Sequence, residues 1–152
     1  MTDPTRVSCP QCAAVNRVPS ARLADAPICG RCKVPLFGAA PIELDQAAFG
    51  RFLADNDLPV LVDFWAPWCG PCMQMAPTFH AAAGKLEPNM RLVKLNTEAN
   101  PQLAAQLNIR SIPTLAVFAN GREVSRQSGA LPGAQLLQFA AQSVAKANTG
   151  YA

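Results

Sequence analysis

Two cysteines separated by two residues, Cys69 and Cys72, have the clearest capacity for chemistry in this 152-residue chain. They follow an apolar run at residues 60–65, which is typical of a strand buried on both faces. The next residues, 73–76, favour a helix. The pair is therefore predicted to lie where a buried strand ends and a helix begins.

The start of a helix suits a reactive thiol. Free N–H groups of the first turn and the helix dipole stabilise an anion there, so the pKa of Cys69 is expected to fall and its nucleophilicity to rise. Cys72, one turn deeper, is expected to be more sheltered. Cys69 can then attack a substrate disulfide and form a mixed disulfide, which Cys72 resolves. Gly70 leaves access to the sulfur, and Pro71 suits a first helical turn.

The sequence around the pair is more informative than the pair itself. Val-Asp-Phe-Trp-Ala at 62–66 and Trp-Cys-Gly-Pro-Cys at 68–72 resemble the active site of the thioredoxin family, whose low thiol pKa is well known. The resemblance covers roughly residues 42–147. It implies reduction of protein disulfides, with thioredoxin reductase restoring the dithiol. The sequence has no glycine-rich nucleotide motif, so NADPH itself is not expected to bind.

One carboxylate, Asp63, interrupts the apolar run. An unpaired ionised carboxylate is costly to bury, so the pKa of Asp63 is expected to rise until the group exchanges a proton near neutral pH. Beneath Cys72 it would deprotonate the resolving thiol. Lys94, on the neighbouring predicted strand, is the candidate that tunes it. The alternatives are a satisfied buried polar group for Asp63 and an ordinary surface lysine for Lys94.

The resemblance also implies a substrate surface. Pro113, within Arg-Ser-Ile-Pro-Thr at 110–114, matches the family's cis proline, which would let the backbone at Ile112 pair with an extended substrate. The alternative is an ordinary proline entering a strand. The expected substrate-binding residues are Trp68, Gly70, Pro71, Ile112, Pro113, Gly129 and Ala130.

Two further Cys-x-x-Cys pairs precede this region: Cys9 with Cys12, and Cys29 with Cys32. Their spacing predicts two knuckles that close a four-sulfur zinc site with no open position, which is a structural site. The segment between them is poor in apolar bulk, so one zinc ion is expected to supply folding free energy. Redox dithiols or a disulfide framework are the alternatives. With the downstream motif, these pairs resemble the zinc-containing thioredoxin 2 type of bacteria.

The remaining pattern predicts an α/β fold. From residue 42 the order is strand, helix, strand, helix, strand, helix, a hairpin turning at Asn120 and Gly121, and a last helix from about residue 132. This mixed central sheet with flanking helices is similar to the thioredoxin fold. Asp45 is a candidate N-cap. We expect a zinc ribbon at 1–36, a linker at 37–41, a thioredoxin domain at 42–148 and a tail at 149–152.

Composition limits the partners. The formal net charge of +3 is too small to indicate nucleic acid or a membrane surface. No stretch approaches the ~20 apolar residues that span a bilayer, and the N-terminus lacks an apolar signal core. A soluble, cytoplasmic monomer is therefore expected, in which the six cysteines are catalytic or metal-binding.

A second function class remains open: a zinc-dependent, redox-regulated holdase or interaction module. In that hypothesis Cys69 and Cys72 act as a sensor, and loss of zinc exposes apolar surface. Insulin reduction with reductase discriminates between the two, because only the enzyme hypothesis requires wild type to outpace Cys69→Ser.

Overall fold

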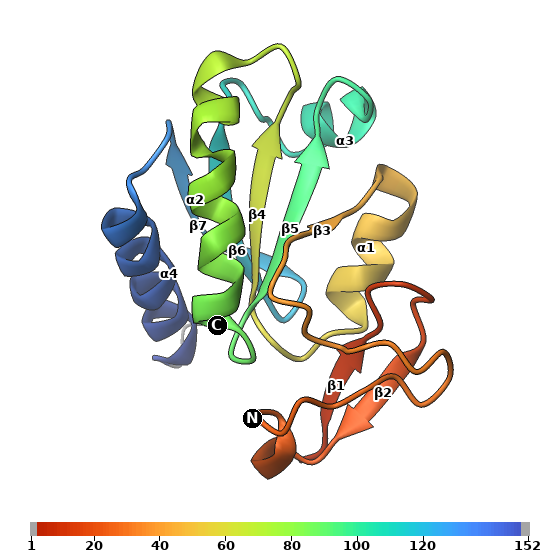
Figure 1. The fold of residues 1–152 in the computed structure, drawn as a ribbon. Helices are drawn as coiled ribbons and strands as arrows, with labels where there is room; N and C mark the ends of the chain where they lie inside the picture. Colours follow the sequence, from red (N-terminus) through yellow and green to blue (C-terminus); the bar gives the residue numbers. More distant parts are fainter. Residues whose placement is uncertain (1–2, 150–152) are drawn as a thin grey trace.

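The computed structural model describes residues 3–149; residues 1–2 and 150–152 fall outside the description, and with them nearly all of the tail predicted at 149–152. A five-stranded sheet with flanking helices forms the larger part, and a two-stranded module joins it at the lower right of Figure 1. The module lies at the end of the sheet where the parallel strands begin.

The larger part confirms the predicted fold and element order. Its strands are β3 (Ile42–Glu43), β4 (Val60–Trp65), β5 (Arg91–Asn96), β6 (Thr114–Ala119) and β7 (Arg122–Ser128), and its helices are α1 (Gln46–Ala54), α2 (Gly70–Leu86), α3 (Pro101–Gln106) and α4 (Gly133–Asn148). The sheet order is β3-β5-β4-β6-β7. Strands β3, β5 and β4 run parallel, while β6 and β7 join antiparallel.

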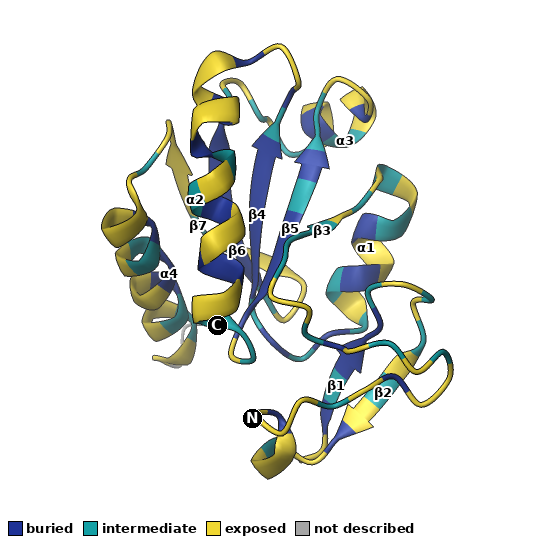
Figure 2. Ribbon diagram, viewed as in Figure 1, coloured by how far each residue is buried: buried dark blue, intermediate teal, exposed yellow. Residues whose placement is uncertain are grey.

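Strand β4 lies at the centre because it is apolar on both faces. Leu61 packs with side chains of α2 and α4, whereas Val62 and Phe64 pack with α1 and α3. Figure 2 shows β4 buried along its length between these helices. Since side chains alternate along a strand, Asp63 shares the face of Leu61 and lies on the side covered by α2 and α4.

Local signals in the sequence set the element ends. The Oδ1 atom of Asp45 accepts a hydrogen bond from Ala48 N at 2.9 Å, which confirms the predicted N-cap of α1. Asn120 and Gly121 have φ values of 55° and 76°, the positive angles that a type I′ hairpin turn requires. The predicted hairpin therefore joins β6 and β7 at these residues.

The small module shares its core with the larger part. Strands β1 (Thr5–Ser8) and β2 (Val15–Val18) pair antiparallel and are followed by a 3-10 turn, η1 (Ser20–Arg22). Its buried cluster includes Val7, Leu23 and Leu36, and also Leu58 from the segment that enters β4. The sequence analysis found the module poor in apolar bulk; the structure adds Leu58 from outside it.

A buried arginine joins the two parts. Arg91, the first residue of β5, is fully buried. Its guanidinium donates to the carbonyl oxygens of Ser8 at 3.0 Å and Leu36 at 3.2 Å, and to Oδ1 of Asn56 at 2.8 Å. These acceptors belong to β1, to the chain leaving the module and to the segment before β4.

No helix within residues 3–149 combines the length and apolarity needed to cross a bilayer.

Candidate functional site

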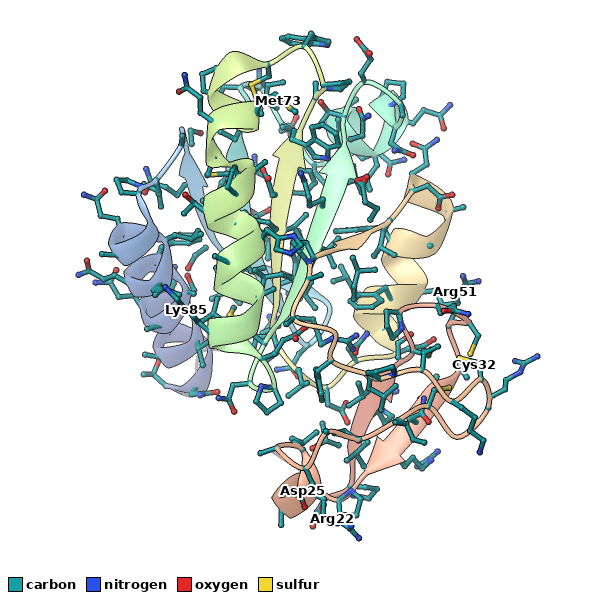
Figure 3. All side chains as sticks on the ribbon, in the orientation of Figure 1. Arg22, Asp25, Cys32, Arg51, Met73 and Lys85 are labelled. Carbon is teal, nitrogen blue, oxygen red and sulfur yellow. A yellow bond between two sulfur atoms is a disulfide. The ribbon has the colours of Figure 1, made fainter. Side chains whose placement is uncertain are left out.

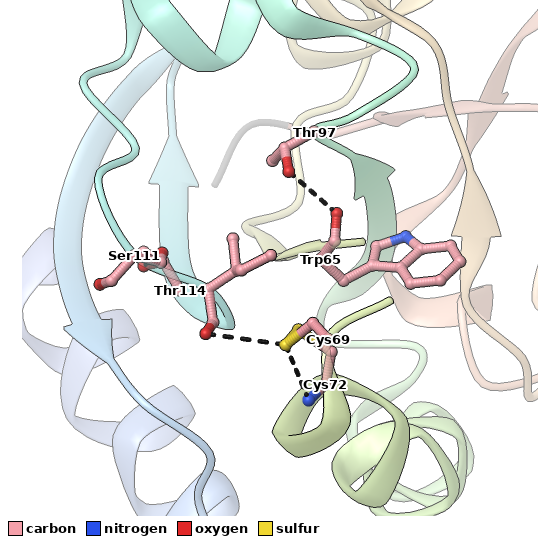
Figure 4. Close-up of a disulfide and its surroundings, with 7 residues drawn as sticks. Trp65, Cys69, Cys72, Thr97, Ser111 and Thr114 are labelled. Atoms are coloured by element: carbon pink, nitrogen blue, oxygen red, sulfur yellow. Dashed lines mark hydrogen bonds between the residues drawn. A yellow bond between two sulfur atoms is a disulfide. The ribbon is translucent and has the colours of Figure 1, made fainter. Parts of the chain in front are cut away.

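The two central cysteines lie where the sequence analysis placed them, between the end of β4 and the start of α2 (Figure 4). Cys69 is the N-cap of α2, and its Sγ accepts a hydrogen bond from the backbone N of Cys72 at 3.2 Å. The two sulfurs are joined as a disulfide. A thiolate at Cys69 would receive the same N–H bond, which stabilises the anion.

Access to the disulfide is narrower than we expected. Cys69 is 5% exposed and Cys72 is 2% exposed. Ala66 is buried with them, and Trp65 and Ile112 pack against this small cluster. The space beside Gly70 is open, because a Cβ atom placed there would meet no heavy atom within 4 Å. Of the two sulfur-bearing residues, Cys69 is thus slightly the more exposed, and Gly70 adds no side chain beside it.

The loop before β6 lies beside Cys69. The Ile112–Pro113 bond is cis, and the carbonyl oxygen of Ile112 lies 3.7 Å from Sγ of Cys69. Gly129 donates its backbone N–H to Pro113 O at 2.8 Å, and its φ of 95° is a conformation that favours glycine. The fold thus places the carbonyl of Ile112, 43 positions further along the chain, beside the sulfur of Cys69.

The other predicted substrate-binding residues differ in exposure. Trp68, which is 67% exposed, stands immediately before Cys69. The other members differ in burial: Gly70, Pro71, Gly129 and Ala130 are exposed, Ile112 is half-buried and Pro113 is buried. Met73, labelled in Figure 3 near the start of α2, is a large exposed apolar side chain to which the sequence analysis gave no role.

Asp63 is completely buried, and neither carboxylate oxygen has a hydrogen-bond partner in the structure. Burial raises its pKa to about 7, and the positive charge of Lys94 opposes part of that rise. In the register of β4 and β5, Asp63 lies directly opposite Lys94. The predicted neighbour relation and the predicted direction of the pKa shift therefore agree with the structure.

The Lys94 ammonium, however, is placed against a ring. Its Nζ lies 4.3 Å from the centroid of the Trp65 indole, and among residues 3–149 the ion pairs within 4.0 Å include none between Lys94 and Asp63. Trp65 and Asp63 are two residues apart on one face of β4. The sequence analysis had assigned no electrostatic role to Trp65.

The four N-terminal cysteines converge on one point. Their sulfurs all lie within 4.8 Å of one another, with Cys9–Cys32 at 3.5 Å and Cys12–Cys29 at 3.7 Å. Zn–S bonds of about 2.3 Å in a tetrahedron place sulfurs about 3.8 Å apart. The spacing fits such an ion, and the four cysteines form a metal site. None of the four is joined in a disulfide.

The two knuckles have matching backbone geometry. Sγ of Cys9 accepts backbone N–H groups from Gln11 and Cys12, both at 3.4 Å, and Sγ of Cys29 accepts the corresponding groups of residues 31 and 32 at 3.3 and 3.5 Å. Such bonds stabilise a sulfur that carries negative charge. They are what thiolate ligands of a cation require.

Asn16 is a further residue whose structural role the sequence analysis missed. Its Oδ1 accepts from Gly30 N at 2.8 Å, and its Nδ2 lies 3.6 Å from Sγ of Cys29. It therefore ties β2 to the second knuckle. No local signal pointed to this contact, because it joins residues 14 positions apart in the chain.

Comparison with known families agrees with both parts of the chain. Residues 40–142 match the family model described as thioredoxin, and residues 8–34 match the one described as the N-terminal region of thioredoxin 2, a zinc ribbon. The first match spans the sheet, its helices and Cys69–Cys72; the second spans all four cysteines of the metal site.

Several relatives are similar over most of their length. Thioredoxin C-3 of Corynebacterium nephridii is 47% identical over 138 residues, covering 91% of this chain and 94% of that protein. Thioredoxin 1 of a Nostoc species is 46% identical over 100 residues, covering 66% and 94%. The chloroplastic M-type thioredoxin of Chlamydomonas reinhardtii is 39% identical over 124 residues, covering 80% and 89%. The chain therefore belongs to the thioredoxin family, with an N-terminal thioredoxin-2 zinc ribbon, and it is a protein-disulfide reductase whose redox-active pair is Cys69 and Cys72.

Proposed function

We propose that Asp63 carries the proton in the second half of disulfide reduction. In the first half, the Cys69 thiolate attacks a substrate disulfide, and one substrate thiolate leaves as the mixed disulfide forms. In the second half, Cys72 gives its proton to the Asp63 carboxylate and attacks Sγ of Cys69. The Cys69–Cys72 disulfide forms, the second substrate thiolate leaves, and the two electrons have passed to the substrate.

The observation that carries this role is a buried carboxyl without a partner on the correct face of β4. Asp63 faces α2, the helix that carries Cys72, and Trp65, two residues on, packs against the cluster that contains Cys72. With a pKa raised to about 7 by burial, the group is nearly balanced between its two protonation states at neutral pH. A general base works best under that condition. Lys94 is the cation that adjusts the balance.

The test is single-turnover kinetics of the reduced protein with a chromogenic disulfide. Asp63→Asn should slow the resolving step on the order of 10²-fold at pH 7 while leaving the first attack unchanged. The difference should shrink as pH approaches the ordinary thiol pKa of about 8.5, because Cys72 then ionises by itself. Glu98→Gln, a change at an exposed carboxylate, is the matched control. A wild-type resolving rate in Asp63→Asn at pH 7 would reject the role.

The proposed substrates are proteins that bear an accessible disulfide. They would bind across Trp68, Gly70, Pro71, Ile112, Pro113, Gly129 and Ala130. Support comes from the exposure of Trp68 and from the Ile112 carbonyl, which lies beside Sγ of Cys69 and can accept a hydrogen bond from a substrate backbone. Membership of the family makes thioredoxin reductase the electron donor that restores the dithiol.

For the metal site we propose one structural zinc ion, held by Cys9, Cys12, Cys29 and Cys32. The donor set of four sulfurs suits zinc, and a site closed by four protein ligands has no position for a reacting water. Bound zinc would supply folding free energy to the ribbon, and the chemistry at Cys69 would proceed without it.

We further propose that the chain comprises the ribbon at 1–36, the linker at 37–41, the thioredoxin domain at 42–148 and the tail at 149–152. The family matches at 8–34 and 40–142 support that division. The proposed location is the cytoplasm, because thiolate ligands and a reducing dithiol require a reducing compartment. The proposed working state is a monomer.

A further inference from the structure

The Lys94 side chain lies between exposed Glu43, which is opposite it on β3, and two neighbours on β4. Directly opposite it in the strand register is the carboxyl of Asp63, and diagonally opposite is the indole of Trp65. Its ammonium lies 4.3 Å from the indole centroid, within the range of a cation–π contact. Both oxygens of Asp63 remain without a hydrogen-bond donor. The cation thus contacts the ring of Trp65, two residues along β4 from the anion that would otherwise attract it.

We propose that Trp65 is a positioning residue for proton transfer: by holding the Lys94 ammonium over its indole ring, it keeps that cation from pairing directly with Asp63 and so keeps the carboxyl able to carry a proton. This inference rests on the proposed role of Asp63. It adds a specific cause for the protonation state of Asp63, namely which neighbour the lysine contacts.

The geometry of Trp65 favours this role over packing alone. The indole Nε1 is buried without an acceptor in the structure, so no hydrogen bond through that atom fixes the ring. Hydrogen bonds hold the backbone of Trp65 instead. Its carbonyl oxygen accepts from Thr97 N at 2.8 Å and from Thr97 Oγ1 at 3.1 Å (Figure 4). Thr97 follows β5, so this bond holds the end of β4 against the strand that carries Lys94.

Few other charges can determine the state of Asp63. The elements next to it on its face of the sheet are α2, α4, β5 and β6; beyond β5, strand β3 places exposed Glu43 opposite Lys94. Strand β6 contributes apolar Leu115 opposite Asp63 and has no charged residue. The other charged or titratable residues of these elements in the described chain are Cys72, which is buried; His80, Lys85 and Lys146, which are exposed; and Arg91, which is directed to the ribbon at the other end of β5. Lys94 is the cation whose field reaches Asp63.

Indole loss should therefore release Lys94 toward Asp63. An opposite charge that moves into contact favours the ionised carboxyl. A carboxylate stabilised in this way accepts the Cys72 proton less readily, so the resolving step would slow although Cys69, Cys72 and Asp63 are all intact.

The test is a pH titration of the Asp63 carboxyl by carbon-13 NMR in the reduced, full-length protein. Trp65→Leu should lower the titration midpoint by about one pH unit, the low end of what a contacting cation does. Trp65→Phe should lower the midpoint less than Trp65→Leu does, because a phenyl ring still holds the cation, although more weakly than an indole does. Lys94→Met should raise the midpoint, since it removes the cation itself.

The decisive comparison is Trp65→Leu in the Lys94→Met background. Without the lysine, loss of the indole should leave the midpoint unchanged. An equal downward shift in both backgrounds would overturn the inference, as would an unchanged or raised midpoint in Trp65→Leu alone. If Trp65→Leu does not fold, Trp65→Phe with and without Lys94→Met makes the same comparison.

The two proposals fail in different ways. A normal resolving rate in Asp63→Asn rejects the catalytic role of the carboxyl, yet the NMR midpoint, measured without turnover, still reports the effect of the ring. An unmoved midpoint in Trp65→Leu rejects the positioning role and leaves the proton-carrying role of Asp63 standing.

Discussion

Asp63 is a buried carboxyl at the centre of the fold, and its ionisation destabilises the folded protein. Burial raises its pKa to about 7 from an ordinary value of 3.8, so the folded protein holds a proton that the unfolded chain releases. Between pH 4 and 7 the native state binds more protons than the unfolded state, and stability must fall as pH rises through this range. Above pH 7 the Asp63 carboxyl is ionised in both the folded and the unfolded state, so stability no longer changes with pH through this group.

Replacing Asp63 by leucine should therefore stabilise the protein most at neutral and alkaline pH. A shift of three pKa units corresponds to about 4 kcal/mol, so the gain in unfolding free energy should grow from pH 4 to pH 7 to a few kcal/mol and then level off. Urea unfolding of the oxidised protein at pH 4.5, 7 and 8.5 measures it, with Glu98→Gln as the exposed control. A gain that is the same at all three pH values would contradict the linkage.

At the scale of the elements, the secondary structure follows from local chemistry. The apolar run that forms β4, the cap at Asp45 and the turn at Asn120 and Gly121 all act within a few residues, so their structural effects could be predicted from the sequence. The same holds for the Cys-x-x-Cys pairs, because their spacing determines their geometry.

The structure adds contacts that spacing does not encode. Arg91 binds Ser8 across 83 residues of sequence, and nothing near either residue signals the other. The sequence analysis could predict that Lys94 lies on the strand next to Asp63. It could not predict that the Lys94 ammonium contacts the Trp65 ring, because that contact depends on a rotamer set by the packing of the whole site. The low exposure of Cys69 likewise depends on distant residues, because Ile112 packs against the cluster that contains it.

The cap of α1 gives a test at this scale. Asp45→Ala removes the acceptor for Ala48 N and should lower the unfolding free energy by about 1 kcal/mol, whereas Asp45→Asn should retain most of it. Since α1 packs on the face of the sheet opposite to α2, the rate of insulin reduction should not change. A reduced rate in Asp45→Ala at a temperature where it is fully folded would show that α1 affects the site after all.

Across the whole molecule, the ribbon and the disulfide lie at opposite ends of the central strands. In Figure 1 the ribbon adjoins the start of β4 and β5, and α2 begins at their far end. Figure 3 shows the same separation between Cys32 and Met73. The metal site therefore acts on the reaction, if at all, only through the packing of the sheet.

Removing the metal with a strong chelator should loosen the ribbon and its contact segment first. Amide hydrogen exchange should accelerate at β1, β2 and residues 56–58, because Ser8, Asn56 and Leu58 join the two parts. Amides of the first turn of α2 should keep their protection. Faster exchange at Cys72 on metal removal would show that the two ends are coupled.

Arg91 makes the strength of that junction measurable. Its guanidinium stacks between the rings of Phe37 and Phe52, each 5.3 Å away, and burial lowers its pKa only to about 10, so it stays charged at neutral pH. Arg91→Met can fill the space beside the rings but removes the guanidinium donor from the carbonyl oxygens of Ser8 and Leu36, while Oδ1 of Asn56 still accepts from Ser8 N at 3.1 Å. Since each buried oxygen that loses its donor costs roughly 1–3 kcal/mol, the unfolding free energy should fall by about 2 kcal/mol or more.

The matched control for Arg91→Met is Arg6→Ala, which removes a more exposed ion pair between the same two parts. Arg6 binds Asp57 at 2.9 Å, but its side chain is 40% exposed, so its loss should lower the unfolding free energy much less than the loss of Arg91 does. Urea unfolding of the metal-loaded proteins compares the two. Equal losses would mean that the ribbon is held by generic surface contacts; a several-fold larger loss in Arg91→Met would mean that one buried cation, from the strand that also carries Lys94, joins the metal module to the catalytic sheet.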